Sequence, residues 1–314
     1  MSEAREALGA VRDEVGRIIV GQQGTVSGLI TALLAGGHVL LEGVPGVAKT
    51  LTVKALAAAL DLEMRRVQFT PDLMPSDVTG QLILDESGRN FRFRQGPVFT
   101  NLLLADEINR TPPKTQAALL EAMEERQVTA EGEAHPLPEP FAVIATQNPV
   151  EYEGTYPLPE AQLDRFLFKL VVGYPDAGQE SEVLARHDAG LDPHDLSVIS
   201  PVADAATIAA AQVEVAAVTV ETVVRDYIVA IARATRESPS VSLGVSPRGA
   251  AMLLHAAKAW AWLSGRDFVT PDEVKAVAKP TLRHRIQVRP EVELEGGTSD
   301  GVLDRVLTSV PVPR

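Results

Sequence analysis

The chain has 314 residues, of which 45% are hydrophobic and 23% are charged, and its formal net charge is −13. These values are typical of a folded protein rather than a disordered one, and the length fits one large and one smaller domain. The negative charge argues against broad affinity for nucleic acid, because phosphate binding needs accumulated lysine and arginine. Cysteine is absent, which excludes disulfides and cysteine-based metal sites and agrees with a reducing compartment.

Targeting and metal-binding features are few. The N-terminal segment Ser2–Glu6 lacks the hydrophobic core of a secretory signal, and no apolar run is long enough to span a bilayer. The six histidines are scattered, and none lies at a metal-ligand spacing with a carboxylate. We therefore expect a cytoplasmic protein that is not inserted in a membrane and has no structural metal.

The first half of the chain alternates apolar strands with helices. The strands are predicted at 38–42, 64–69, 101–105, 141–145 and 166–172. The runs Leu102–Leu104 and Ala142–Ile144 are apolar at consecutive positions, which is typical of strands buried on both faces. Helices are predicted between strands, at 51–60 and 114–125. This pattern predicts an α/β fold in which a parallel sheet is flanked by helices.

A β-hairpin is predicted between the second and third strands, with its own strands at 82–84 and 91–94 and its turn at 86–90. Alternation places two phenylalanines on one face and two arginines on the other: Phe91 and Phe93, then Arg92 and Arg94. The hairpin could bind single-stranded nucleic acid, or it could be half-buried with solvated arginines, which we favour. A second hairpin is expected between 127 and 141, and its acidic turn suits nucleic acid poorly.

The strand pattern stops near 174–176, and the rest of the chain is mostly helical. Helices are predicted at 205–218, 220–236, 248–263 and 271–278. The last of these has Thr270 as N-cap and Pro271 at its first position. We place the domain boundary at about residue 175, with an α/β core over 1–175 and a helical domain over 176–314. The acidic segment 291–300 is expected to be a solvated, mobile end.

The segment Gly43–Thr50, with the sequence GVPGVAKT, is a candidate phosphate-binding loop because it joins a predicted strand to a predicted helix. Its glycines let backbone N–H groups face phosphate oxygens, and the helix N-terminus adds a positive dipole end. Lys49 would reach the β- and γ-phosphates, and the Thr50 hydroxyl would ligate Mg²⁺. Ala48 replaces the usual glycine, and we expect it to be tolerated at a negative φ. The alternative is a glycine-rich turn that binds nothing.

Polar residues also follow two of the buried strands. Asp106 and Glu107 follow the third strand, at the edge where a parallel sheet places its ligand. Asp106 suits Mg²⁺ coordination, and Glu107 suits the activation of the water that attacks a γ-phosphate. Asn148 follows the fourth strand and could contact the γ-phosphate or orient that water. The alternatives are acidic residues that simply end a strand at the surface, and an ordinary Asn-Pro turn.

These motifs together resemble the AAA+ ATPases and, within them, the MoxR family. The most specific stretches are QFTPDLMPSDVTG at 68–80, DEINR at 106–110 and EGTYPLPEAQLDRF at 153–166. The resemblance covers nearly the whole chain. It implies an AAA+ αβα core with a five-stranded parallel sheet, a smaller all-helical lid domain, and a homo-oligomeric ring, usually a hexamer.

The resemblance also assigns residues to a site that binds ATP and Mg²⁺. Nucleotide would be bound along the loop, at Gly43, Val44, Pro45, Gly46, Val47, Ala48, Lys49, Thr50 and Leu51. Walker A would comprise Lys49 and Thr50, Walker B would comprise Asp106 and Glu107, and Asn148 would be sensor 1. Mg²⁺ would be held by Thr50 and Asp106.

Four further residues gain a role from the resemblance. Arg165 would be an arginine finger reaching the γ-phosphate of a neighbouring subunit, the alternative being a surface pair with Asp164. Arg248, at the start of a predicted helix, resembles sensor 2, which couples nucleotide state to the lid. Its position opposes the helix dipole unless an anion compensates it. Val20 and Gly21 resemble the segment that contacts adenine, although apolar packing would explain them equally well.

The function implied is Mg-ATP hydrolysis by a ring that remodels or activates partner proteins. The client class comes from the resemblance alone: proteins with a von Willebrand factor A domain, often in metalloenzyme or cell-envelope complexes. A nucleic-acid motor or loader is the first alternative, supported by Arg92 and Arg94 and opposed by the net charge. A chelatase-type subunit is a second. A scaffold that binds nucleotide without turnover is a third, and the presence of Glu107 argues against it.

Overall fold

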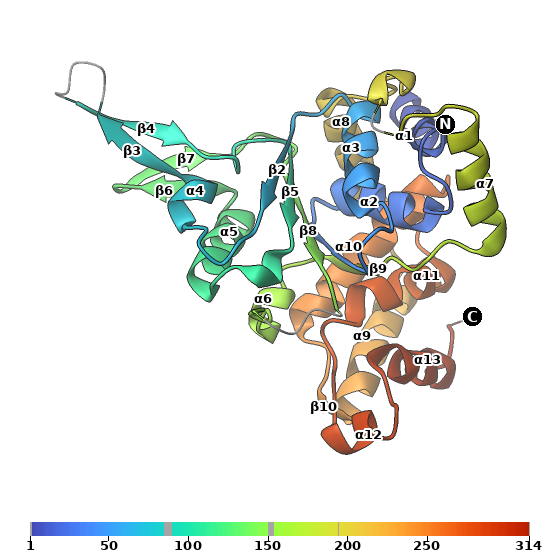
Figure 1. Ribbon diagram of the computed structural model, residues 1–314. Helices are drawn as coiled ribbons and strands as arrows, with labels where there is room; N and C mark the ends of the chain where they lie inside the picture. The colour runs from blue at the N-terminus through green and yellow to red at the C-terminus, as the bar shows by residue number, and fades with distance from the viewer. Residues whose placement is uncertain (1, 85–89, 150–153, 194, 314) are drawn as a thin grey trace.

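A computed structural model of the chain describes residues 2–84, 90–149, 154–193 and 195–313. Its centre is a five-stranded sheet with the order β2-β5-β8-β1-β9, in which all neighbouring strands are parallel (Figure 1). The strands are β1 (Val39–Glu42), β2 (Met64–Gln68), β5 (Leu102–Asp106), β8 (Ala142–Gln147) and β9 (Phe168–Val171). The predicted fold class is confirmed, and each strand lies at its predicted place.

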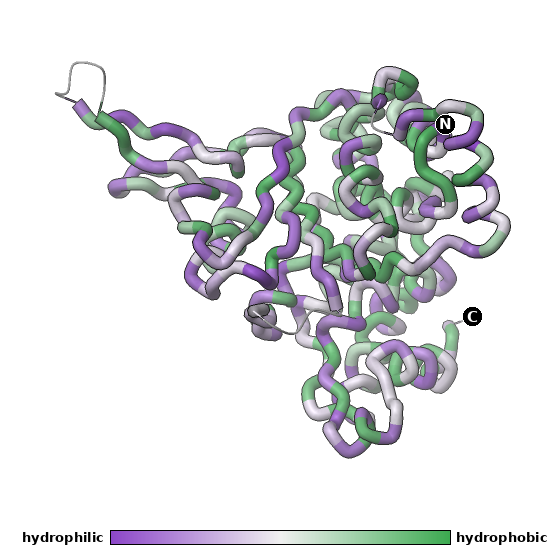
Figure 2. The backbone as a smooth tube through the Cα atoms, viewed as in Figure 1, coloured by the Kyte–Doolittle hydropathy of each residue, from purple (hydrophilic) through white to green (hydrophobic). Residues whose placement is uncertain are grey.

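The sheet is covered on both faces because its inner strands, β5, β8 and β1, are apolar at successive positions. Val39 and Leu41 of β1 join one buried cluster with the helices α1 (Glu3–Gly16), α2 (Gln23–Leu34) and α3 (Lys49–Ala59). Leu40, between them, joins a second cluster with α5 (Pro113–Glu125). Figure 1 shows these two helical layers on opposite sides of the sheet, and Figure 2 shows apolar segments running through the strands. Alternating side chains thus bury both faces.

The chain after residue 175 is mainly helical, as predicted. Its elements are α7 (Ala177–Asp188), η2 (Leu196–Val198), α8 (Ala205–Ala217), α9 (Thr222–Glu237), β10 (Val241–Leu243), α10 (Pro247–Leu263), α11 (Pro271–Leu282), β11 (Gln287–Val288), α12 (Pro290–Leu294) and α13 (Ser299–Ser309). Trp262 of α10 is fully buried in the same cluster as α1 to α3. The helical region therefore packs onto one face of the core, and the boundary at residue 175 stays a prediction. Among the described residues, no helix is long and apolar enough to cross a membrane.

The C-terminal segment corrects one expectation. We expected 291–300 to be a mobile end, but α12 and α13 lie there and beyond it. Val302, Leu303 and Val306 of α13 are buried against the other C-terminal helices. Arg283 also pairs with Asp300 at 3.0 Å. The segment is solvated, as Leu294 illustrates with 90% exposure, but it is held in place.

Two hairpins project from the side of the sheet that α5 covers (Figure 1). One consists of β3 (Gly80–Leu84) and β4 (Phe91–Gln95), preceded by α4 (Pro75–Thr79), and the other of β6 (Gln127–Ala130) and β7 (Glu133–Pro136). Both were predicted, although most of the turn expected at 86–90 lies outside the described residues. Phe93 stacks on His135 with ring centroids 4.2 Å apart, so the hairpins contact each other.

Candidate active site

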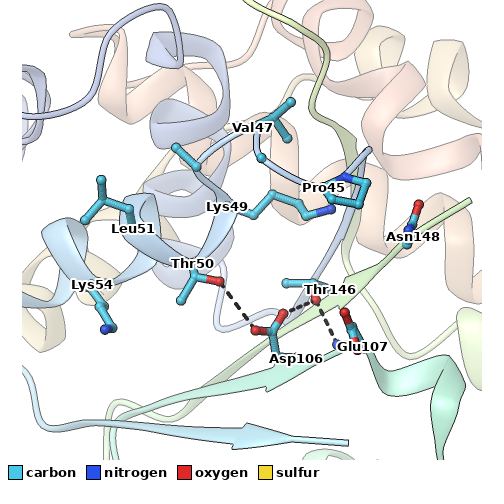
Figure 3. A pocket seen from close by; sticks show the side chains of 12 residues that line it. Pro45, Val47, Lys49, Thr50, Leu51, Lys54, Asp106, Glu107, Thr146 and Asn148 are labelled. Carbon is cyan, nitrogen blue, oxygen red and sulfur yellow. Dashed lines mark hydrogen bonds between the residues drawn. The ribbon is translucent and has the colours of Figure 1, made fainter. Parts of the chain in front are cut away.

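The loop between β1 and α3 opens onto a cavity of about 410 Å³ at the carboxyl edge of the sheet (Figure 3). The cavity is lined by Pro45, Gly46, Val47, Ala48, Lys49, Thr50, Leu51, Lys54, Asp106, Glu107, Thr146 and Asn148. Three separate segments contribute these residues: the loop with α3, the end of β5 and the end of β8. The structure therefore brings together the predicted loop, both predicted carboxylates and Asn148.

The loop has a tight backbone, and one detail of it contradicts the sequence analysis. Gly46 has a φ of 85°, and Ala48, expected at a negative φ, has a φ of 58°. That left-handed conformation costs a residue with a side chain roughly 1–2 kcal/mol. Ala48 is also the N-cap of α3 and provides no side-chain cap, so the first N–H groups of α3 lack that partner. Such a helix start suits an anionic ligand.

The start of the loop is packed closely and carries the lysine. A Cβ atom at Gly43 would lie 2.4 Å from the carbonyl oxygen of Val172, so only glycine fits there. Lys49 Nζ donates to the carbonyl oxygen of Gly43 and, at 3.3 Å, to that of Val44. The ammonium group thus lies inside the curve of the loop (Figure 3). A phosphate in the cavity would meet this charge.

Asp106 is the centre of a small polar network. Its Oδ2 atom accepts from Thr50 Oγ1 at 3.4 Å, and its Oδ1 atom accepts from Thr146 Oγ1 at 2.5 Å (Figure 3). Arg66 of β2 also donates to Oδ2, at 2.7 and 3.0 Å. A threonine hydroxyl beside a carboxylate is an oxygen donor set that Mg²⁺ accepts. The residues present therefore fit the cation, and Arg66 supplies the counter-charge in this structure.

Glu107 is held in a strained backbone conformation beside this network. Its φ and ψ are 56° and 50°, in the left-handed region. Its N–H donates to Thr146 Oγ1 at 2.9 Å, and its Oε2 atom accepts from Gln68 Nε2 at 2.7 Å. Arg110 Nε lies 3.2 Å from the same oxygen. Strain of this kind persists where neighbouring groups enforce it, which is common at functional sites.

Three of these partners were not predicted from the sequence: Arg66, Gln68 and Thr146. All three lie on strands next to β5, and two of them lie within the last two residues of their strands. Their position near the carboxyl ends of parallel strands could have indicated them, because α/β sheets bind ligands at that edge. Only Asp106, Glu107 and Asn148 were singled out by it.

Arg165 and Arg248 do not line the cavity; they meet elsewhere, at Glu124 near the end of α5. Arg248 Nη2 lies 2.6 Å from Glu124 Oε2, and Arg165 Nε lies 3.8 Å from the same atom. The hydrogen bond from Arg248 lowers the pKa of Glu124. Arg248 opposes the dipole of α10, and the anion that compensates its charge in this structure is the Glu124 carboxylate. Asp164 pairs with Arg285 rather than with its sequence neighbour.

Val20 and Gly21 do not line the cavity at the phosphate-binding loop. Gly21 lines a different cavity, of about 330 Å³, together with Thr25 and Tyr174. Its φ is 77°, and a Cβ atom there would lie 2.5 Å from Gln179 Oε1. The positive φ favours glycine there, whereas the contact is with the end of a flexible side chain, which can move. The adenine contact proposed for Val20 and Gly21 stays a prediction.

Comparisons with known proteins cover both parts of the chain. The family model "ATPase family associated with various cellular activities (AAA)" matches residues 38–168, and the model "AAA lid domain" matches residues 233–306. The chain is 49% identical over 306 residues to the uncharacterised Bacillus subtilis protein YeaC, covering 98% of this chain and 95% of that protein. It is 44% identical over 311 residues to Chaperone MoxR1 of Mycobacterium tuberculosis, covering 96% and 81%. A crystal structure of a candidate ATPase from Cytophaga hutchinsonii superposes with a TM-score of 0.90 at 41% identity, covering 99% and 96%.

Proposed function

Because the chain belongs to the MoxR family of AAA+ ATPases, we propose that it hydrolyses ATP to ADP and phosphate in a ring with shared sites. One observation carries this proposal. The cavity holds the loop, Lys49, Asp106 and Glu107, whereas Arg165 and Arg248 lie outside it on Glu124. A site complete in one subunit would have Arg165 and Arg248, as well as Lys49, within the cavity. Two arginines placed elsewhere suit a site completed by a neighbouring subunit.

Within one subunit, the cavity residues have separate tasks in this proposal. The N–H groups of the loop and Lys49 bind the phosphates, and Thr50 and Asp106 hold Mg²⁺, which neutralises charge on the phosphates when bound. Glu107 accepts a proton from the attacking water, and Gln68 and the Thr146 hydroxyl fix the orientation of Glu107. Asn148 orients the water or contacts the γ-phosphate.

Arg165 and Arg248 act on the neighbouring subunit in this proposal. In the single chain, the one carboxylate of Glu124 pairs with both guanidinium groups, at 2.6 Å with Arg248 and at 3.8 Å with Arg165, so one positive charge of the pair is left over. A γ-phosphate presented by the neighbour is a second anion for the same pair, and it would compete with Glu124 for them. An arginine finger typically contributes about 10³–10⁵ to the rate of phosphoryl transfer.

Mixing two inactive variants tests whether the site is shared. Arg165→Ala keeps a cavity that can bind ATP but lacks the arginine finger. Lys49→Ala keeps the finger but lacks the lysine that binds the phosphates. Each alone should be inactive, and the mixture should regain ATP turnover that rises with protein concentration. A mixture that stays inactive, or an Arg165→Ala variant with full turnover at every concentration, would contradict a site shared between subunits.

We further propose a chaperone-like role toward partner proteins. The relative Chaperone MoxR1 is named for such a role. We propose clients with a von Willebrand factor A domain on the family resemblance alone. A purified domain of that kind should bind the Glu107→Gln variant in Mg-ATP more strongly than the Lys49→Ala variant. Equal binding to both variants would contradict nucleotide-dependent client binding. The cytoplasmic location and the hexameric ring stay predictions.

A nucleic-acid motor is the second candidate function, because the projecting β4 strand exposes Arg92 and Arg94. The net charge of −13 opposes it. Saturable stimulation of ATP turnover by single-stranded DNA at low salt, lost in Arg92→Ala/Arg94→Ala, would favour it. Absence of binding at low salt would remove it.

A further inference from the structure

Arg285, just after α11, is a charged side chain buried in the interior. Only 2% of its side chain is exposed, and burial lowers its pKa to about 10. Burying a guanidinium group costs several kcal/mol unless its donors are matched by partners in good geometry. The partners of Arg285 therefore indicate what the fold gains from this residue.

Most of those partners belong to the four-residue segment Asp164–Leu167. Arg285 Nε donates to the Asp164 carboxylate at 2.7 Å, and Nη2 donates to the backbone oxygens of Asp164 and Phe166 at 2.9 and 2.5 Å. Its Nη1 atom donates to the backbone oxygen of Leu167 at 3.2 Å. The planar fork of one arginine thus fixes the backbone on both sides of Arg165.

The same side chain also packs against α10, one turn from Arg248. Arg285 Nη2 lies 2.6 Å from Met252 Sδ. A Cβ atom at Gly249, the residue next to Arg248, would lie 2.8 Å from Arg285 Cδ. Arg285 therefore contacts the immediate surroundings of both arginines that converge on Glu124, and it joins two segments that lie more than 80 residues apart in the chain.

We propose that Arg285 is a positioning residue that sets Arg165 and Arg248 together toward the active site of the neighbouring subunit. The proposal rests on the shared site of the proposed function. Its physical basis is that several hydrogen bonds from one rigid fork define a single backbone geometry, which a lysine with a single flexible ammonium group cannot reproduce. A lid shift that moves α10 and α11 would then move Arg165 with it.

Two mixtures of variants measure separately how Arg285→Lys affects the arginine finger that a subunit donates to its neighbour and how it affects the subunit's own ATP-binding cavity. In the donor mixture, Arg285→Lys/Lys49→Ala is combined with Arg165→Ala, so turnover depends on fingers donated by Arg285→Lys chains. In the owner mixture, Arg285→Lys/Arg165→Ala is combined with Lys49→Ala, so turnover depends on cavities owned by Arg285→Lys chains. The reference for both is Lys49→Ala combined with Arg165→Ala.

We expect the donor mixture to fall about tenfold or more below the reference, because misplacing a catalytic group by about 1 Å can cost about 100-fold in rate. The owner mixture should stay within about twofold of the reference. A general loss of structure would lower both mixtures equally. An inactive reference mixture would mean that the shared site itself fails, whereas an active reference with equal losses, or with no loss, would overturn the role of Arg285.

Two further variants keep the test decisive if Arg285→Lys folds poorly, which thermal unfolding would reveal. Asp164→Asn removes one charged partner of Arg285 and should cause a smaller loss, again only in the donor mixture. Arg266→Lys is the matched control, because Arg266 pairs with Glu273 at 2.6 Å at the opposite end of α11. It should leave both mixtures unchanged. A donor-specific loss in Arg266→Lys, or none in Asp164→Asn, would overturn the proposal.

Discussion

Ala48 joins the phosphate-binding loop to α3 in a conformation that favours glycine. Its φ of 58° costs an alanine roughly 1–2 kcal/mol, whereas the greater freedom of glycine in the unfolded chain costs about 0.4–1 kcal/mol. We therefore expect Ala48→Gly to raise the free energy of unfolding by about 0.5–1 kcal/mol. Urea unfolding of the nucleotide-free protein measures this difference.

Gly46→Ala is the matched control for Ala48→Gly within the same loop. Gly46 has a φ of 85°, and no atom lies within 4 Å of the position its Cβ would take. The change therefore adds backbone strain without a clash, and it should lower the free energy of unfolding by about 1 kcal/mol. Equal signs for the two variants would show that φ does not govern stability at this loop.

At the scale of elements, His38 ties β1 to two neighbours. Its Nδ1 atom accepts from the N–H of Val143 in β8, and its Nε2 atom lies 3.2 Å from the carbonyl oxygen of Met123 in α5. Burial, aided by the charge of Arg126, lowers the pKa of His38 to about 3. The imidazole is therefore neutral in the folded protein, and unfolding takes up a proton below the ordinary pKa of about 6.5.

Because unfolding takes up a proton at His38, acid lowers the free energy of unfolding of the protein. The contribution of His38 to stability is complete above pH 6.5 and falls by about 1.4 kcal/mol per pH unit below it, down to the folded pKa. Between pH 7.5 and 5.5 the wild type should lose about 1.4 kcal/mol more unfolding free energy than His38→Gln. Urea unfolding at both pH values measures this. Buried His284, whose pKa is also lowered by burial, is present in both proteins and cancels. Identical pH dependence in the two proteins would contradict a buried neutral His38.

Most elements with a strong apolar pattern were predicted, but α1 and α2 were missed, although α2 buries nine of its 12 residues. Strands β1, β5, β8 and β9 contain consecutive apolar residues, whereas β2, with the sequence MRRVQ, does not. Helix α10, predicted at 248–263, spans Pro247–Leu263. Helix α7 was missed because it buries no residue and so has no apolar stripe. Its markers were a capping box at Asp176 and Gln179 and the charges at its ends, which are Glu180 in the first turn and Arg186 and His187 in the last. In α13 the spacing of Val302, Leu303 and Val306 does indicate a helix, but the acidic segment before it suggested a mobile end.

At the scale of the whole molecule, the site was predictable where it is local in sequence. Gly43–Thr50 and the pair Asp106 and Glu107 follow their strands directly, so motif and context agree. Partners from other strands depend on strand order and register, which no local pattern encodes. Gln68 pairs in register with Asp106, and Ala145 with Ala105, which brings Gln68 and Thr146 to the carboxylates. The meeting of Arg165 and Arg248 at Glu124 likewise depends on how the lid packs on the core.

The shared site also predicts how nucleotide controls assembly. Glu107→Gln removes the general base, which should lower ATP turnover by about 10²–10⁴-fold. It leaves Lys49 and Asp106 in place, so ATP should stay bound. A retained γ-phosphate then remains available to Arg165 and Arg248 of the neighbour, and each charge-assisted hydrogen bond stabilises the interface. We therefore expect this variant to form larger assemblies in Mg-ATP than without nucleotide.

Sedimentation velocity measures the mass of Glu107→Gln with and without Mg-ATP, and filter binding measures the ATP retained. Glu107→Gln/Arg165→Ala is the matched control, because it keeps the cavity and removes one cation from the interface. Its mass should respond less to ATP, since only Arg248 then remains to meet the γ-phosphate. Wild-type turnover in Glu107→Gln would remove Glu107 as the base. Bound ATP with no change in mass would instead show that the ring, if it forms, is held by contacts other than those two arginines.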